Sequence, residues 1–314
     1  MTATALTEPA RPARQRALRP TGLTWTLLRV HRSALWFWLM YVAVAAGVLL
    51  WLYGPGANAA MDELVRSGCR DGGAPDLGCD MLGPAGSRWD YTVALAGGMI
   101  ALAPILIAAW AGGSLIGREL EDGTARLAWT QSVSPARWLA AKLTVPAVLI
   151  IAGMIPLTLL YRMMWAANPE LREFSWHWFD YPVFNANGVL ATVYPLFGLA
   201  FGALVGMVTR RSLPGLGVSL VGAGIVVQQL LSLRPYLWPA ETQRSTDELP
   251  EVWMPVGEGS YTSTGARLGE HRDYHPPSHF WPLQLVETGI VLALATVAAL
   301  IAFAVLRRRT GAAV

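Results

Sequence analysis

Six long apolar runs constrain this chain more than any other feature. Each run is long enough to cross the hydrocarbon layer of a bilayer, which takes about 20 apolar residues in a helix. Backbone groups in lipid must bond within their own structure, and the runs lack the period-two alternation of a membrane β-barrel. We therefore expect an all-α, polytopic membrane protein with six transmembrane helices. The expected spans are about residues 34–53, 92–116, 143–161, 187–208, 213–233 and 286–306.

The charged residues are few and unevenly placed. They make up 14% of the chain, against roughly 25% in soluble domains. If the N-terminus is cytoplasmic, 15 of the 24 Lys and Arg residues fall in the inside segments, although the outside loops are longer. Because the loops richer in Lys and Arg stay in the cytoplasm, we expect both termini on the cytoplasmic side of the membrane.

The chain divides at the start of the first span. Residues 1–33 form a cytoplasmic tail that ends in an amphipathic stretch, where Leu23, Leu27 and Val30 recur at helical spacing. This stretch predicts an interface helix lying on the inner membrane surface. The alternative is that it only extends the first span. Residues 34–314 form the six-span transmembrane domain.

The loops on the outer side differ in content. Cys69 and Cys79 are the only cysteines, and both lie in the first outer loop. An oxidising compartment would let them pair. We therefore expect a disulfide, with two unpaired thiols as the alternative. The last outer loop, residues 234–285, is the longest and is rich in proline, and we place no element in it.

Small residues line two of the expected spans. Gly198, Gly202 and Gly206 form a doubled G-x-x-x-G on one helix face, and Gly113 and Gly117 repeat the spacing in the second span. Faces of this kind let two helix backbones approach closely. The spacing predicts close packing, either within this chain's own bundle or between subunits.

One polar segment interrupts the apolar pattern. Residues 117–143 carry seven charges, whereas residues 92–116 carry none. A charged side chain at the centre of a bilayer costs on the order of 2.5–3.5 kcal/mol. The segment must therefore lie outside the lipid, and the expected orientation places it in the cytoplasm. A plain connector needs far fewer residues, as the sequence Thr209–Ser212 shows.

The polar segment also has internal signals of structure. Asp122, Gly123 and Thr124 predict a turn, with Asp122 or Thr124 placed to cap a short helix that follows. Ser134 before Pro135 predicts the start of the third spanning helix. We expect a turn, a short surface helix and a second turn, an arrangement suited to a protein partner. The alternative is a structured loop without a partner.

This segment resembles the cytoplasmic loop of permease subunits in ABC-type exporters of the type-2 class. The motif of that family reads roughly E-x-E-E-G-T, then a short helix, an Arg, and a Lys before the next span. The six-span layout also matches, and the stretch His279–Gly289 resembles the start of the last span in actinobacterial members. Asp122 replaces a common Glu. The matching residues are Glu119, Glu121, Asp122, Gly123, Thr124, Arg137 and Lys142.

The resemblance implies the membrane-spanning permease subunit of an ATP-driven exporter. In this family two permease subunits, identical or different, pair with two separate ATP-binding subunits. The loop between spans two and three carries the coupling helix that contacts the ATPase. An apolar bundle with few charges suits a lipophilic or amphipathic substrate.

The resemblance and the residue types together give an ATPase-coupling set. Gly123 permits the sharp turn, and the acidic residues are expected to pair with basic groups on the partner or with Arg126 and Arg137. Leu127 and Trp129 are expected to be apolar anchors, since buried aromatic residues often dominate interfaces. The full set is Glu119, Glu121, Asp122, Gly123, Thr124, Arg126, Leu127, Trp129, Arg137 and Lys142.

The chain has no sequence route to binding ATP itself. The P-loop pattern G-x-x-x-x-G-K-[ST] is absent, and Lys142, the only lysine, follows two alanines. We therefore assign no catalytic residue, cofactor or metal to this subunit and expect a partner to hydrolyse ATP.

Two other functional classes fit parts of the sequence. A membrane-embedded enzyme would need metal or catalytic residues, and His271, His275 and His279 recur every four residues. Pro276 and Pro277 would break a helix that joins them, so histidines in a solvated loop are favoured. A permease-like immunity or sensor protein that transports nothing is the main alternative.

A proton-coupled transporter would require ionisable groups deep in the spans. The first five expected spans have none in their interiors. Gln284 and Glu287 lie near the outer end of the sixth span, either as an interfacial anchor or as polar residues on the exit side. The sequence therefore favours a transporter powered by a partner.

Overall fold

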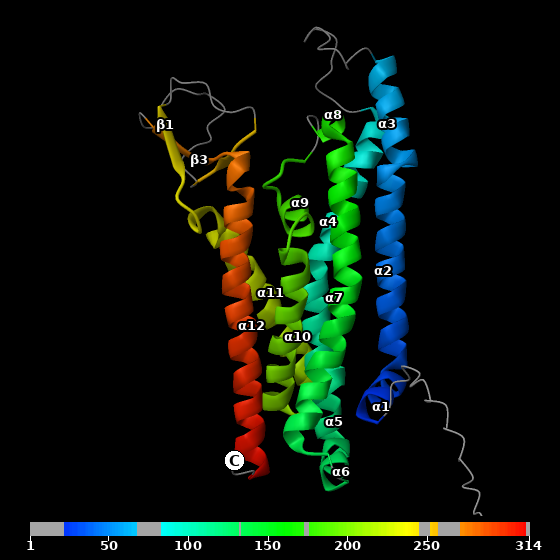
Figure 1. Ribbon diagram of the computed structural model, residues 1–314, viewed down its shortest axis with the longest axis vertical. Coiled ribbons are helices and arrows are strands. Elements are labelled where there is room, and N and C mark those ends of the chain that lie inside the picture. The colour runs from blue at the N-terminus through cyan, green and yellow to red at the C-terminus, as the bar shows by residue number, and fades with distance from the viewer. Residues whose placement is uncertain are drawn as a thin grey trace, which may run out of the picture.

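The computed structural model describes residues 22–67, 83–131, 133–172, 176–244, 252–256 and 271–311. Within these residues it contains six helices that are long and apolar enough to cross a membrane. They stand side by side along the long axis of the molecule (Figure 1). The structure therefore confirms an all-α, polytopic membrane protein. The six spans are Arg32–Arg66, Pro84–Glu121, Pro135–Ala167, Leu190–Thr209, Ser212–Tyr236 and Pro277–Thr310.

Short elements connect and extend these spans. The α-helices are α1 (Leu23–Val30), α2 (Arg32–Tyr53), α3 (Pro55–Arg66), α4 (Pro84–Trp110), α5 (Arg118–Glu121), α6 (Thr124–Thr130), α7 (Pro135–Ala167), α8 (Pro169–Arg172), α9 (Tyr181–Ala186), α10 (Leu190–Thr209), α11 (Ser212–Leu233) and α12 (Phe280–Thr310). The other elements are the π-helix η2 (Ala111–Gly117), the 3-10 helices η3 (Arg234–Tyr236) and η5 (Pro277–His279), and the strands β1 (Glu241–Arg244), β2 (Met254–Pro255) and β3 (His271–His275).

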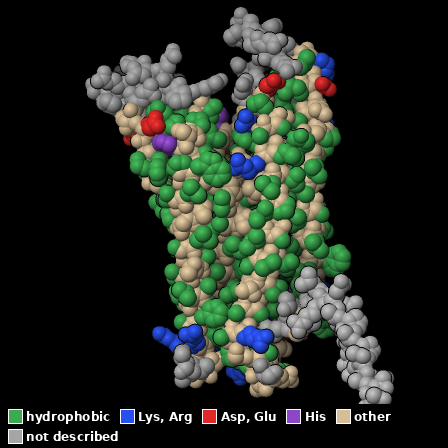
Figure 2. Space-filling view, viewed as in Figure 1, with side chains coloured by type: hydrophobic (Ala, Val, Ile, Leu, Met, Phe, Trp, Pro, Cys, Tyr) green, Lys and Arg blue, Asp and Glu red, His purple; other side chains and the backbone are tan. Residues whose placement is uncertain are grey.

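The two ends of the bundle differ. One end carries α6 and the C-terminal part of α12, and we call it the α6 end; the other carries the strands, and we call it the sheet end (Figure 1). Figure 2 shows charged side chains towards both ends and a middle band of hydrophobic and uncharged side chains. This distribution matches that expected for a chain that spans a membrane.

Most helices run further than the apolar runs alone predict. α3 and α4 occupy much of the expected loop between spans one and two, and α12 begins at Phe280 rather than near residue 286. The carboxylate of Glu63 on α3 accepts hydrogen bonds from the backbone N–H groups of Ala85 and Gly86, at 2.7 and 2.8 Å. These bonds satisfy donors that are unpaired at the start of α4. Cys69 and Cys79 lie outside the described residues.

The glycine faces pack inside this chain. α10 lies among α4, α7, α11 and α12. A Cβ atom on Gly198 or Gly202 would lie 2.2 or 2.3 Å from a carbonyl oxygen of α4, that of Pro104 or Ala108, and one on Gly206 would lie 2.8 Å from the Gly112 carbonyl oxygen in η2. Glycine is required at these positions because the helix backbones lie so close together that a Cβ atom would not fit. Of the two alternatives left by the sequence, the structure shows packing within the bundle.

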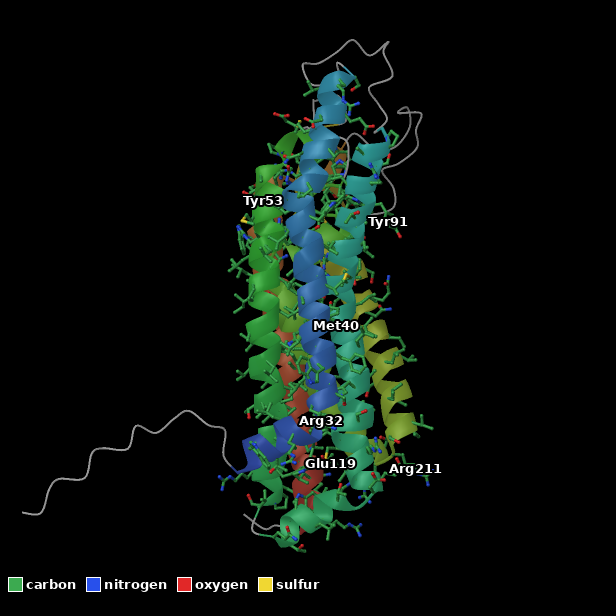
Figure 3. The ribbon with its side chains drawn as sticks, turned by 90° about the vertical axis from the view of Figure 1, so that its right-hand side faces the viewer. Arg32, Met40, Tyr53, Tyr91, Glu119 and Arg211 are labelled. Atoms are coloured by element: carbon green, nitrogen blue, oxygen red, sulfur yellow. The ribbon has the colours of Figure 1, made fainter. Side chains whose placement is uncertain are left out.

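α1 is a separate helix and not a straight extension of the first span. The chain turns at His31, and α1 lies across the foot of α2 (Figure 3). Trp25 and Val30 on α1 are exposed, at 48% and 61% of their surface. Apolar side chains on a helix that lies across the bundle suit a membrane surface.

The last loop forms a small sheet that the sequence did not predict. β3 lies between β1 and β2 and is antiparallel to both. Glu241 pairs with Tyr274 in the first ladder, and Met254 pairs with His275 in the second. The sheet sits beside the start of α12 (Figure 1).

Candidate functional site

The polar segment folds as a turn, a short helix and a second turn at the α6 end. Gly123 adopts a φ of 72°, in the left-handed region, and begins α6. Neither Asp122 nor Thr124 caps α6, so that prediction was wrong; the hydroxyl of Thr124 donates to the Glu119 carbonyl instead, at 3.2 Å. The predicted start of α7 is confirmed, because Ser134 accepts a hydrogen bond from the Arg137 backbone.

A buried ion pair anchors the polar segment to the bundle. The Nζ atom of Lys142 lies 2.6 Å from Oε1 of Glu119, and the lysine is 1% exposed. The same Nζ donates to the Leu115 carbonyl at 2.9 Å and lies 3.4 Å from Nε2 of His31. A lysine has three donors, and these three acceptors satisfy all of them. Lys142 is therefore an internal anchor and is not exposed to a partner.

Two tryptophans extend this cluster to α6. The indole N–H of Trp138 donates to Oε2 of Glu119 at 3.2 Å. The ring of Trp129 packs edge-on against Trp138, with ring centroids 5.7 Å apart. Trp129 therefore holds α6 against α7. Trp129 is only partly buried by these contacts, so its expected role as an apolar anchor for a partner stays a prediction.

Glu121 connects the polar segment to the turn between α10 and α11. Its Oε2 atom accepts hydrogen bonds from both the backbone N–H and the hydroxyl of Ser212, at 2.8 and 2.7 Å. Asp122 lies 3.6 Å from Arg118 in an exposed i,i+4 pair. The acidic residues thus find partners within the chain. These partners are not Arg126 or Arg137, contrary to one of the alternatives from the sequence.

The outer face of α6 is the exposed part of the site. Leu127 is 62% exposed, and Arg126, Thr130 and Thr124 are also exposed. Ala125 is buried against the bundle. We call the exposed residues Asp122, Thr124, Arg126, Leu127 and Thr130 the α6 surface. The buried cluster holds the α6 surface in place. A displacement of the α6 surface would therefore also displace α4, α7 and α11.

His31 belongs to the buried cluster but was not predicted as a site residue. Burial and, to a smaller extent, the charge of Lys142 lower its pKa to about 4, although Glu119 partly opposes them. His31 is therefore neutral at pH 7 and can accept from Lys142. It links the turn between α1 and α2 to the base of the polar segment. No sequence signal distinguished it, because its partners lie far away along the chain.

We expect the folded state to lose stability as the pH falls from about 6.5 towards 4. An unfolded chain binds a proton at His31 near its ordinary pKa of about 6.5, whereas the folded chain binds it only near 4. The unfolded state therefore holds more protons between these values, and acid favours unfolding. Thermal unfolding in detergent should show this slope, and His31→Gln should reduce it. His177→Gln, at an exposed histidine, is the control; an unchanged slope in His31→Gln would contradict the assignment.

A second buried polar cluster lies at the sheet end. Arg234, 3% exposed, pairs with Glu287, 0% exposed, through bonds of 2.7 and 2.9 Å. The guanidinium also donates to Asn185 at 2.6 Å and lies 4.1 Å from the centre of the Phe184 ring. Tyr194 donates its hydroxyl to Glu287 at 2.5 Å. The cluster joins α9, α10, η3 and α12.

The burial of these groups bears on two expectations. Glu287 and Gln284 are both 0% exposed, so neither is an interfacial anchor. Gln284 donates to the Phe184 carbonyl at 2.6 Å and accepts from the Leu190 backbone at 3.4 Å. The first five expected spans hold no ionisable residue, but the bundle nevertheless encloses Lys142 and Arg234, which flank expected spans, and Glu287 of the sixth.

An apolar groove opens beside the buried pair at the α6 end. Its volume is about 1230 Å³, and it lies between α1 and α2 on one side and α4 and α7 on the other. Figure 3 shows Met40, one of its lining residues, on α2, above Arg32 and Glu119. The groove has a polar end formed by His31, Glu119 and Lys142. Its apolar lining includes Trp38, Met40, Leu106, Ile107 and Ile150.

Comparison with known proteins places a large part of the chain in one family. The family model described as ABC-2 membrane transporter related matches residues 39–234. The match includes the whole polar segment, α9, α10 and Arg234. No curated protein and no solved structure matches the chain.

Proposed function

We propose that this chain, which belongs to the family of ABC-2 membrane transporter related proteins, is the permease subunit of an ATP-driven exporter. Membership makes it a component of a membrane transporter and implies an ABC transporter with an ATP-binding partner. Export as the direction of transport is our inference.

 The contacts that hold the α6 surface carry the proposal, because they make α6 an exposed helix rigidly joined to several spans.

The α6 surface suits a docking site for an ATP-binding subunit. It presents one large apolar side chain, Leu127, among polar and charged residues. Interfaces commonly combine an apolar centre with a polar rim. Behind it, Glu119 and Lys142 hold α5 to α7, while Glu121 reaches the start of α11. A motion of the partner would therefore move several spans together.

We expect Leu127→Asp to reduce the amount of ATP-binding subunit retained by roughly tenfold or more, a loss of about 1.4 kcal/mol in docking free energy. The substitution puts a charge where docking would remove water, and an unpaired buried charge is costly. Co-purification in mild detergent, with permease expression level as the reference, measures this loss. Gln131→Asp adds the same charge just beyond α6 and is the matched control. Equal losses in both variants would contradict a contact at Leu127.

We also propose the orientation in which the α6 end and both termini face the cytoplasm of a bacterial cell. The bias of Lys and Arg towards the inside segments supports it. In a Cys69→Ser/Cys79→Ser background, a membrane-impermeant thiol reagent should label Asn58→Cys on intact cells. It should label Thr130→Cys only after the membrane is permeabilised. The reverse pattern would overturn the orientation.

The groove at the α6 end supports a lipophilic or amphipathic substrate. The groove is mostly apolar with one polar end, and its volume of about 1230 Å³ is comparable to the largest typical ligand pockets, roughly 300–1,000 Å³. We propose that Gln284 and Glu287 act on the exit side, where their cluster connects four elements.

The assembly is part of the same proposal. We infer two permease copies, identical or different, with two ATP-binding subunits, and a disulfide between Cys69 and Cys79 remains a prediction. The experiment that tests the function is to identify the protein that co-purifies in mild detergent and to assay ATP hydrolysis. An ABC-type ATPase whose activity depends on this chain supports transport. A kinase or regulator in its place would favour the immunity or sensor alternative.

A further inference from the structure

The apolar groove at the α6 end is about as long as one leaflet of a bilayer is deep. Its lining on α2 extends from Ser33 to Val44, which is about 17 Å at the helical rise of 1.5 Å per residue. Its lining on α7 extends from Trp138 to Ile150, which is about 18 Å by the same rise. Half of the hydrocarbon core of a bilayer measures about 15 Å. The groove therefore has the length of the acyl chains of a lipid in the leaflet at the α6 end.

The walls of the groove are open to the surrounding lipid. Phe37, Met40 and Val44 line the groove from α2, and Leu106 lines it from α4. All four side chains are more than half exposed, and Figure 3 shows Met40 on the face of α2 that is turned to the viewer. Lipid tails are as apolar as leucine. An acyl chain can therefore enter the groove from the bilayer without crossing a polar surface.

Two serine hydroxyls lie at the polar end of the groove. Ser33 at the start of α2 and Ser114 in η2 line the groove and are exposed. Neither hydroxyl has a hydrogen-bond partner in the part of the chain that the structure describes. Glu119 and Lys142 beside them already bind each other. A hydroxyl both donates and accepts, so the serines can bind the ester or glycerol oxygens of a lipid while the ion pair stays intact.

Two arginines give the polar end of the groove a positive rim. Arg29 on α1 and Arg32 at the start of α2 are exposed and flank His31, which lines the groove. Among the described residues, neither arginine forms an ion pair with an acidic side chain. Arg118, which also lines the groove, is paired with Asp122. Basic groups between spans at the end of a bundle bind the head groups of anionic lipids.

A second copy of this chain fits the groove less well than a lipid does. Two copies inserted in the same direction are related by an axis along the bilayer normal, so that equal heights of the two chains meet. Arg29 and Arg32 of one copy would then approach the same arginines of the other. Like charges brought together at an interface are destabilising. The charge at the rim of the groove therefore favours an anionic lipid over a second permease.

We propose that the groove binds a phospholipid with an anionic head group from the leaflet at the α6 end. The acyl chains lie along α2, α4 and α7, and the phosphate pairs with Arg29 and Arg32. Because Glu119 and Lys142 belong to the polar end, the bound lipid reaches the cluster that holds the α6 surface. This is the groove proposed above for the substrate. To call the lipid a substrate rests on the proposed function, whereas its binding does not.

Native mass spectrometry of the full-length protein in mild detergent tests the binding. The delipidated protein is mixed with dioleoyl phosphatidylglycerol, which is anionic, or with dioleoyl phosphatidylcholine, which is zwitterionic. We expect each chain to retain phosphatidylglycerol in preference to phosphatidylcholine by roughly tenfold or more, as two basic contacts to an anionic lipid allow. Equal retention of the two lipids would overturn the proposal.

Removal of the two arginines tests the contact with the head group. Arg29→Gln/Arg32→Gln should lose most of the preference for phosphatidylglycerol. Arg307→Gln/Arg308→Gln is the matched control, because it removes two exposed charges from α12 at the same end, and it should keep the preference. The proposal fails if both double variants keep the preference or if both lose it.

Filling the groove tests the contact with the acyl chains. Leu106→Trp should prevent most of the retention of both lipids. Leu159→Trp, at an exposed residue of α7 that does not line the groove, should retain them like the parent protein. Unchanged retention in Leu106→Trp, or an equal loss in Leu159→Trp, would overturn the proposal. A lipid-free dimer that Leu106→Trp dissociates would place a second copy in the groove and would overturn it too.

A transport assay separates this inference from the proposed function. The same phosphatidylglycerol, labelled and placed in vesicles with the permease and its ATP-binding partner, reports whether the bound lipid is exported. Binding with ATP-driven transport supports both statements. Binding without transport supports the lipid site and rejects export of this lipid. Transport without preferential binding in the groove overturns the site and leaves the proposed function in place.

Discussion

Glu119→Ala is expected to destabilise the α6 end by about 3–5 kcal/mol, the range found when one partner of a buried ion pair is removed. Lys142, at 1% exposure, would lose its counter-ion, and burying the amine is then costly whether it stays charged or gives up its proton. Trp138 would also lose the carboxylate that accepts its N–H. We expect a lower unfolding temperature and a marked loss of the co-purified ATP-binding subunit, because α6 would no longer be held in place.

Two further variants separate the pair from its surroundings. The double variant Glu119→Gln/Lys142→Met removes both charges, and much of the stability should return, since uncharged replacements of buried pairs are often tolerated. Asp122→Ala breaks only the exposed pair with Arg118, which should cost about 0–1 kcal/mol. If Glu119→Ala is no more harmful than Asp122→Ala, the buried pair does not anchor the segment.

The spans could be predicted from the sequence because each is a continuous apolar run whose meaning does not depend on its neighbours. Length and hydropathy suffice for a helix that crosses lipid. The glycine faces were also readable, since close helix packing requires small residues at fixed spacing. Whether Gly198 and Gly202 pack within the chain could not be read, because that depends on where α4 lies.

The buried charges show where sequence reasoning failed. A charge near the end of an apolar run is normally assigned to the loop, and Lys142 was assigned in this way. Its burial depends on Glu119, which is 23 positions away, and on His31, which is 111 positions away. Arg234 and Glu287 are separated by 53 positions. A charged side chain can be buried when a group of opposite charge meets it. A single sequence does not show which distant groups meet, so such buried pairs cannot be recognised from it.

The short elements in the outer loops could not be predicted for a related reason. The sheet of β1, β2 and β3 is built from short segments with little periodicity, and its pairing joins Glu241 to Tyr274 across a long stretch of chain. α9 is only Tyr181–Ala186; Asp180 and Pro182 mark its start, but six residues show too little helical periodicity to predict a helix. Both elements exist because they pack against spans that are already in place. Tertiary contacts, and not local preference, stabilise such short elements.

Glu287→Ala is expected to have an equally large effect at the sheet end, a loss of about 3–5 kcal/mol. Arg234 would stay buried at 3% exposure with only Asn185 and the Phe184 ring as partners. Tyr194 would lose its acceptor. Thermal unfolding should show the loss, and Asp62→Asn, at an exposed acidic residue of α3 near the same end, should show almost none.

The double variant Arg234→Met/Glu287→Leu distinguishes a structural role of this cluster from a role in transport. Removing both charges leaves no unpaired ion, so the stability lost in Glu287→Ala should largely return. If the cluster only supports the fold, export by the double variant should return as well. We expect export to stay impaired, because apolar packing would hold α10, η3 and α12 together without the polar contacts proposed to act on the exit side. Full recovery of both stability and export would reject the exit-side role and leave the cluster as a fold element alone.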